Sequence, residues 1–157
     1  MSVEHRAFSF PTPDATARHA STLATTLEPG DVVLLQGDVG AGKSHFARAL
    51  IQSLLPVPED VPSPTFTLVQ TYELDKGDLW HADLYRLTST NEIEELGLTE
   101  AFETDICLIE WPERLGLLTP ANALTLRLEA TSVPDERKVI AHWSDPKWTK
   151  KLRDWQS

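Results

Sequence analysis

Cysteine is almost absent from this sequence, with Cys107 the only one in 157 residues. A single cysteine excludes an intrachain disulfide and a zinc site built from several cysteines. Because Cys107 lies inside the apolar run Ile106–Ile109, we expect it to be a small core residue. Long apolar runs are also missing: residues 1–6 lack the hydrophobic stretch of a secretory signal, and no segment approaches the roughly 18 apolar residues of a transmembrane helix. We therefore expect a cytoplasmic protein.

Basic residues are scarce as well, with 14 Lys and Arg against 24 Asp and Glu and a formal net charge of −10. A surface that binds nucleic acid needs an excess of lysine and arginine, because these residues displace counterions from the phosphates. We therefore expect no strong direct binding to nucleic acid, although the same charge also serves solubility. With 41% hydrophobic residues, the chain has the composition of one globular domain spanning residues 1–157.

The most informative motif is Gly37-Asp38-Val39-Gly40-Ala41-Gly42-Lys43-Ser44, which fits the phosphate-loop pattern G-x-x-x-x-G-K-[ST]. It lies between residues 32–35, an apolar run typical of a buried strand, and residues 46–54, whose apolar positions recur at helical spacing. The glycines permit backbone conformations that turn successive N–H groups toward phosphate oxygens. Lys43 supplies a positive charge for the outer phosphates, and Ser44 supplies a hydroxyl for Mg²⁺. We assign Asp38 through Ser44 to a nucleoside triphosphate site.

The rest of the chain alternates between strand-like and helix-like segments. The patterns predict an edge strand at 5–10, a helix from Thr12 to about Leu27, a loop at 56–64, hairpin strands at 66–74 and 78–85, a helix after 89–91, strands at 106–109, 124–128 and 139–143, and a helix at 146–157 docked on the core through Trp148, Leu152 and Trp155. These segments indicate an α/β fold, a three-layer sandwich like that of P-loop NTPases. Its sheet would be mixed but mostly parallel, with an antiparallel hairpin and helices on both faces.

Two acidic residues follow or end predicted strands. Glu110 comes directly after the strand at 106–109, where the carboxyl end of a buried strand meets the ligand crevice of an open α/β sheet, and it is our candidate for Mg²⁺. Asp83 lies in His81-Ala82-Asp83-Leu84-Tyr85-Arg86, and strand alternation puts His81, Asp83 and Tyr85 on one face. That face either lines a reaction cleft or is solvated. The sequence also permits the two acids to exchange roles.

Two further segments remain open to two interpretations each. Ser63-Pro64-Thr65-Phe66-Thr67 places hydroxyls on a proline-stiffened loop that either closes over the terminal phosphate or is an ordinary polar loop. Trp111 follows Glu110 and either stacks near the nucleotide or fills core volume.

The motifs taken together resemble the bacterial TsaE family, also called YjeE, the ATPase component of tRNA threonylcarbamoyladenosine synthesis. The resemblance is carried in order by residues 37–44, 63–69, 81–87 and 109–112, and it spans roughly residues 12 to 140. It implies that Lys43 binds phosphates, that Ser44 and Glu110 hold Mg²⁺, that Asp83 is needed for turnover and that Thr65 belongs to a switch-like loop. It also implies that Pro13, at the start of the first helix, lies beside the adenine, and that Arg137 approaches the nucleotide.

The activity implied by the resemblance is weak, Mg²⁺-dependent ATP hydrolysis that resets a complex of two other subunits, proteins of the TsaB and TsaD type. That complex, rather than this chain, would transfer the threonylcarbamoyl group. Ser44 replaces the more usual threonine of the family, and either hydroxyl ligates Mg²⁺. The first alternative is a small-molecule P-loop kinase. Such a kinase usually gathers several arginines in a lid around the transferred phosphate, whereas the arginines of this sequence are scattered, at Arg86, Arg114, Arg127 and Arg137. The second is a GTP-type switch, but no Asn-Lys-x-Asp segment is present, which favours ATP.

Overall fold

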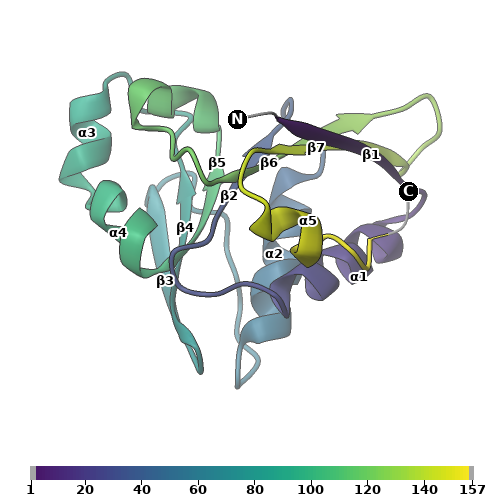
Figure 1. The fold of residues 1–157 in the computed structure, drawn as a ribbon, viewed down its shortest axis with the longest axis horizontal. Coiled ribbons are helices and arrows are strands. Elements are labelled where there is room, and N and C mark those ends of the chain that lie inside the picture. The colour runs from purple at the N-terminus through teal and green to yellow at the C-terminus, as the bar shows by residue number, and fades with distance from the viewer. Residues whose placement is uncertain (1–2, 156–157) are drawn as a thin grey trace.

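A computed structural model describes residues 3–155 and contains a seven-stranded sheet with the order β1-β7-β6-β2-β5-β4-β3 (Figure 1). The strands are β1 (Glu4–Phe10), β2 (Val32–Gln36), β3 (Val69–Leu74), β4 (Gly77–Asp83), β5 (Ile106–Glu110), β6 (Leu124–Ala130) and β7 (Arg137–Trp143). The four central strands, β6, β2, β5 and β4, run parallel to one another. Antiparallel pairs flank them, β3 with β4 at one edge and β7 with both β6 and β1 at the other. The predicted mixed sheet with an antiparallel hairpin is confirmed.

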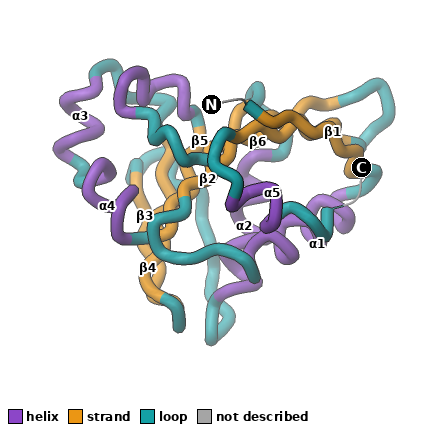
Figure 2. The backbone as a smooth tube through the Cα atoms, viewed as in Figure 1, coloured by secondary structure: helices purple, strands orange, loops and turns teal. Residues whose placement is uncertain are grey.

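Helices pack on both faces of this sheet (Figures 1 and 2). They are α1 (Pro13–Ala24), α2 (Lys43–Leu54), α3 (Thr90–Glu95), α4 (Leu98–Thr104), the 3₁₀ helix η1 (Pro112–Leu118) and α5 (Lys147–Lys151). Alternate residues of β2 pack into two different hydrophobic cores, one on each face of the sheet. Val33 and Leu35 pack with α1, α2 and α5, whereas Val32 and Leu34 pack with α3, α4 and η1. The fully apolar β2 therefore suits a strand covered on both sides, and the three-layer prediction is confirmed.

The first helix begins as the sequence predicts but ends earlier. Thr12 Oγ1 accepts a hydrogen bond from the Ala15 N–H at 3.0 Å, and Pro13 occupies the first helical position. The helix was expected to reach about Leu27, yet it ends at Ala24. The following backbone forms tighter bonds, from Thr26 N–H to Leu23 O at 2.9 Å, and the Thr26 hydroxyl bonds the same carbonyl. Hydroxyl residues thus compete with helix continuation at this end.

The hairpin strands are shorter than the predicted 66–74 and 78–85. The first strand begins only at Val69, because the Leu68 N–H turns back to Pro64 O and Leu68 itself has a positive φ of 70°. The second strand ends at Asp83, after which the Leu84 N–H bonds Glu110 O at 3.1 Å. The loop predicted at 56–64 is confirmed, and it is longer than predicted, because residues 55–68 form no helix or strand.

Two helices replace the single one predicted after residues 89–91. Ser89 caps α3, but Gly97 adopts a left-handed φ of 85° and separates α3 from α4. The predicted C-terminal helix is also shorter than 146–157, since α5 covers Lys147–Lys151 and residues 156–157 lie outside the described chain. Its docking is confirmed, because Trp148, Leu152 and Trp155 are all buried, as is Cys107. Within residues 3–155, no helix is both long and apolar enough to cross a membrane.

Candidate functional site

The phosphate loop joins β2 to α2 and has the backbone that its glycines were expected to allow. Gly37, Gly40 and Gly42 have φ values of 144°, 84° and 103°. A Cβ atom on Gly37 would lie 2.5 Å from the carbonyl oxygen of Leu128 in β6, a distance at which the backbone would have to move. Because α2 begins at Lys43, its N-terminus faces the loop, and its free N–H groups favour a bound anion.

Arg137, the first residue of β7, holds the outside of this loop. Its Nε donates to Ala41 O at 2.9 Å and one terminal nitrogen donates to Gly40 O at 3.4 Å. Its other terminal nitrogen bonds Glu136 O. These bonds connect β7 to a loop that lies almost 100 residues earlier in the sequence and commit the guanidinium to loop carbonyls.

The Lys43 side chain is buried and folded back onto its own loop. Its ammonium donates to Gly37 O and, at 3.4 Å, to Asp38 O, and it lies 3.9 Å from the centre of the Trp111 ring. Burial lowers the pKa of Lys43, and the charges of nearby carboxylates, led by Glu110 and Glu113, oppose that shift. A phosphate group would offer this ammonium a direct counter-charge in place of carbonyl oxygens.

Glu110 is the buried end of β5, and both of its carboxylate oxygens have partners. Ser44 Oγ donates to Oε1 at 3.0 Å, and His81 Nε2 lies 2.7 Å from Oε2. Glu110 and His81 are only 2% and 1% exposed, so the pair is shielded from water. The hydroxyl that follows the loop lysine is therefore in direct contact with the acid that the sequence proposed as its partner.

Asp83 ends the neighbouring strand β4 and has a different set of partners. Thr65 Oγ1 donates to Oδ2 at 3.2 Å, and the Tyr85 N–H donates to Oδ1 at 2.9 Å. Ser63 Oγ lies 2.8 Å from Thr65 Oγ1 and extends the chain of hydroxyls. Asp83 and His81 are buried, so the solvated-face interpretation of these two residues is wrong, whereas Tyr85 is 48% exposed.

A pocket of about 560 Å³, which we call the reaction pocket, brings most of the proposed site residues together. It is lined by Asp38, Val39, Gly40, Gly42, Lys43, Ser44, His45, Thr65, Asp83, Tyr85, Glu110, Trp111 and Arg137. Two proposed residues do not line it. Ala41 lies on the other side of the loop, and Pro13 lies beside α2, where its carbonyl oxygen is 3.1 Å from His45 Nε2.

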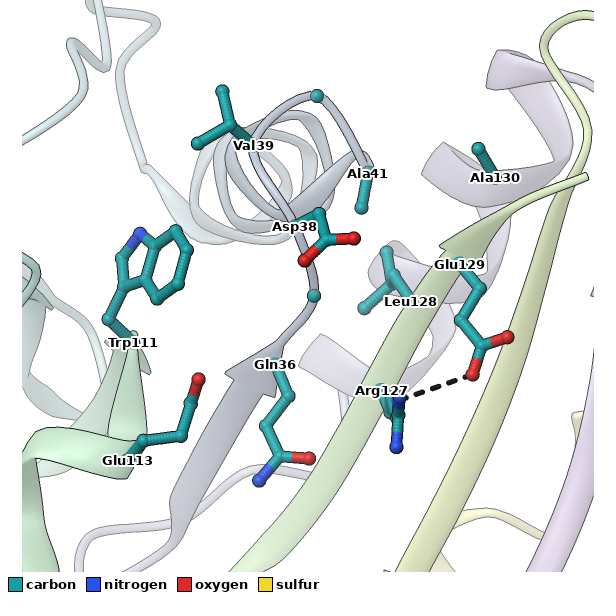
Figure 3. A pocket seen from close by; sticks show the side chains of 12 residues that line it. Gln36, Asp38, Val39, Ala41, Trp111, Glu113, Arg127, Leu128, Glu129 and Ala130 are labelled. Atoms are coloured by element: carbon teal, nitrogen blue, oxygen red, sulfur yellow. Dashed lines mark ion pairs between the residues drawn. The ribbon is translucent and has the colours of Figure 1, made fainter.

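A second pocket of about 660 Å³, the outer pocket, lies across the phosphate loop (Figure 3). Trp111 and the loop residues Asp38 to Gly40 contribute to both pockets. The outer pocket is otherwise lined by Gln36, Gly37, Ala41, Glu113, Arg127, Leu128, Glu129 and Ala130, and Arg127 pairs with Glu129 at 3.2 Å. Lys43, Ser44, Asp83 and Glu110 all line the reaction pocket instead, so the residues predicted for phosphate and Mg²⁺ lie on that side of the loop.

Two contacts at this site were not predicted from the sequence. Trp111 has the left-handed angles φ 58° and ψ 52°, which place a bulky residue in a region that costs roughly 1–3 kcal/mol. That backbone lets its ring lie over Lys43 and 4.7 Å from the Tyr85 ring. The bond from His81 to Glu110 was also missed, although the shared strand face of His81 and Asp83 was a signal for it.

The oxygen atoms in the reaction pocket fit Mg²⁺. Among residues 3–155, no group of three or more His, Cys, Asp or Glu side chains is arranged to hold a metal by itself. Magnesium in phosphate-transfer sites needs only one or two protein ligands, because phosphates and water complete its octahedron. The Ser44 hydroxyl and Glu110 Oε1, 3.0 Å apart at the beginning of α2, offer two hard oxygen atoms of the kind that such a site needs.

Comparison with known proteins gives one consistent family. A family model described as "Threonylcarbamoyl adenosine biosynthesis protein TsaE" matches residues 10–139. A Rickettsia felis protein named "tRNA threonylcarbamoyladenosine biosynthesis protein TsaE" is 42% identical over 81% of this chain and 72% of its own length. The Treponema pallidum and Bacillus subtilis proteins of the same name are 39% and 35% identical, over 80% and 81% of this chain and 93% and 78% of theirs.

A solved structure agrees with these sequence matches. The crystal structure of Bacillus subtilis YdiB superposes with a TM-score of 0.79 at 26% identity, covering 98% of this chain and 95% of the other. The segment matched by the family model contains the phosphate loop, Thr65, Asp83, Glu110 and Arg137, and it ends inside β7, so that the rest of β7 and α5 lie beyond it. The chain therefore belongs to the TsaE family, whose members serve in the biosynthesis of threonylcarbamoyladenosine in tRNA.

Proposed function

We propose that this protein is a Mg²⁺-dependent ATPase that supports threonylcarbamoyladenosine modification of tRNA. The observation that carries this proposal is the convergence of Lys43, Ser44, Asp83 and Glu110 in one pocket beside a glycine loop and a helix N-terminus. Family membership connects such a site to tRNA modification. Phosphoryl transfer in P-loop NTPases requires these same groups: a loop that binds phosphates, a lysine, a hydroxyl and an acid.

Binding of the triphosphate is the task of the loop and Lys43. The loop N–H groups and the start of α2 surround the phosphate oxygens, and Lys43 exchanges the carbonyl of Gly37 for the outer phosphates. Ser44 and Glu110 would hold Mg²⁺, which would neutralise negative charge on the phosphates when it is bound. Catalysis in this arrangement is positioning and electrostatic stabilisation.

Hydrolysis needs a water aligned with the terminal phosphate, and Asp83 with the Thr65 loop is the group we assign to it. Asp83 is the second carboxylate in the pocket. It accepts a hydrogen bond from Thr65, in the switch-like loop at 63–67, rather than from the phosphate loop. The attacking water forms a bond to the γ-phosphorus while the bond from that phosphorus to the β-phosphate oxygen breaks, which gives ADP and inorganic phosphate and releases a proton to the solvent. Thr65 thereby links the state of the terminal phosphate to the 63–67 segment.

We expect slow turnover by the isolated chain, because the arginines of its described part leave no free guanidinium for the transferred phosphate. Of those in residues 3–155, only Arg137 lines the reaction pocket, and its nitrogens are bonded to carbonyl oxygens of Gly40, Ala41 and Glu136. A transition state with spread negative charge would gain from a free arginine. We propose that partner subunits of the TsaB and TsaD type complete the site and that ATP hydrolysis resets their complex. The dispersed arginines also support this function over a small-molecule kinase.

The adenine end of the nucleotide is assigned to the start of α1. Pro13 lies against His45, two residues after Lys43, which puts the α1 N-terminus beside the beginning of α2. Arg137 contributes by holding the loop in shape. ATP is the proposed nucleotide because no guanine-reading Asn-Lys-x-Asp segment occurs in the sequence.

The proposal is tested by ADP formation in purified Lys43→Ala protein. We expect turnover at least about 100-fold below wild type, because an electrostatic clamp on the phosphates is lost. Lys138→Ala, which removes an exposed lysine of β7, is the matched control and should behave as wild type. Equal turnover in the Lys43→Ala and wild-type proteins would contradict the proposed site.

A further inference from the structure

We infer that His81 is a positioning residue that fixes the carboxylate of Glu110 for magnesium. This inference rests on the proposed function and adds a residue to the same site. His81 does not line the reaction pocket, so it acts through Glu110 rather than on the nucleotide.

The contact is built into the sheet. β4 and β5 are parallel neighbours, with His81 opposite Leu108 and Asp83 opposite Glu110, so that all these side chains share the α2 face. His81 Nε2 and Glu110 Oε2 are 2.7 Å apart, and the two residues are 1% and 2% exposed. A short contact between side chains that are closed off from water holds the carboxylate in one orientation.

The direction of the hydrogen bond follows from its partners. A carboxylate oxygen accepts, so Nε2 must carry the proton that His81 donates to Glu110. The other ring nitrogen, Nδ1, is buried and has no partner among the described residues. The ring therefore has a single polar contact, and that contact is with Glu110.

The two oxygens of Glu110 thus have separate tasks. Oε2 is held by His81, and Oε1 is left facing Ser44. Groups that orient a ligand in this way commonly contribute 10–100-fold to metal affinity or activity. Asp83 has its own donors, Thr65 and the Tyr85 N–H, and does not depend on His81. Loss of His81 should therefore affect the magnesium-dependent part of the reaction selectively.

The test compares two amides at this position. In His81→Gln the side-chain N–H₂ extends about as far as Nε2 and reaches Glu110, whereas in His81→Asn it ends near the position of Nδ1 and does not. We expect His81→Gln to keep turnover within about threefold of wild type and His81→Asn to need about 10–100-fold more Mg²⁺ for half-maximal ADP formation. His142→Ala, on the far strand β7, is the control for loss of a histidine.

A second readout does not depend on turnover. Calorimetric titration with ATP in EDTA should give the same affinity for wild type and His81→Asn within about twofold, because the loop and Lys43 are unchanged. Adding Mg²⁺ should raise the affinity of the wild type for ATP but should raise that of His81→Asn much less. Equal behaviour of His81→Asn and His81→Gln, with and without Mg²⁺, would overturn the inference.

A double-mutant cycle with Glu110→Gln separates action through Glu110 from independent action. If His81 works through this carboxylate, adding His81→Asn to Glu110→Gln should reduce turnover by less than about twofold further. Full additivity would contradict the inference. A wild-type protein that neither binds nor hydrolyses ATP would instead remove the proposed function itself, so the two failures are distinguishable.

Discussion

Buried charges gather at both ends of the central strand β2, and the two groups are satisfied in different ways. Before β2, the Asp31 carboxylate pairs with Lys147 at 2.7 Å and Lys151 at 2.9 Å and accepts the Glu28 N–H. Lys76 donates to Ala24 O and Leu27 O and caps the end of α1. We call this group the Asp31 cluster. Its charges are matched by opposite charges or by helix-end carbonyls, which is the arrangement of a structural cluster.

A second group of buried polar side chains, which includes Lys43 and His81 and which we call the group after β2, is less completely paired. Lys43 is bonded to loop carbonyls and lies under Trp111 without a carboxylate in ion-pair distance, and Nδ1 of His81 has no partner within the described chain. Trp111 holds a strained backbone in the same place. Polar groups left partly satisfied beside a pocket are typical of functional sites, whereas complete pairing is typical of stability. The comparison predicts that mutations at the two ends separate activity from stability.

The largest effect on activity is expected from Asp83→Asn. The amide keeps the size of the side chain but loses the charge that we assign to positioning water, so turnover should fall about 100-fold or more. ATP binding should change by less than about threefold, because the loop is untouched. ADP formation and calorimetry measure the two quantities. Asp135→Asn, in an exposed turn with φ 66° that asparagine tolerates, is the control.

The largest effect on stability is expected from Asp31→Asn. Removal of this buried carboxylate leaves Lys147 and Lys151 without their counter-charge, and we expect the free energy of unfolding to fall by about 2–3 kcal/mol. This is less than for a fully buried pair, because the Lys147 side chain is 28% exposed. Urea denaturation measures the loss, with Asp78→Asn as an exposed control. A turnover per folded molecule that also fell tenfold would contradict the assignment of the Asp31 cluster to stability alone.

Lowering the pH should also reduce the stability provided by Asp31, by a smaller amount than the Asp31→Asn substitution. Burial raises the pKa of Asp31, but hydrogen bonds from Lys147 and Lys151 outweigh it, and the net pKa lies below the ordinary 3.8. A lowered folded-state pKa means that the stabilisation is complete above the unfolded value and is lost as the pH falls through the folded one. The stability difference between wild type and Asp31→Asn should therefore shrink below about pH 4. A constant difference from pH 7 to pH 2 would exclude this origin.

Local patterns in the sequence were sufficient for the fold and for bringing most of the predicted residues to the reaction pocket. The phosphate loop, the buried strands and the capped start of α1 each depend on residues close together in the chain, and all three were predicted. The placement of Glu110 beside Ser44 also followed, because carboxyl ends of parallel strands meet at one edge of the sheet.

The side-chain contacts that were missed depend on residues far apart in the sequence. The left-handed backbone of Trp111 is stabilised by packing against Lys43 and Tyr85 rather than by its own preference. The bond between His81 and Glu110 requires the register of β4 on β5, which local periodicity does not specify. The Asp31 cluster joins residues more than 100 positions apart, so no local pattern indicated it.

The central claim is that the group after β2 is a binding site for ATP and Mg²⁺. Calorimetric titration of folded wild-type protein with ATP in Mg²⁺ tests it most directly, beside the same titration of Lys43→Ala. We expect saturation by one ATP per chain in the wild type and a loss of most of that affinity in the variant. Absence of heat or saturation with any nucleoside triphosphate in the folded wild type would contradict it.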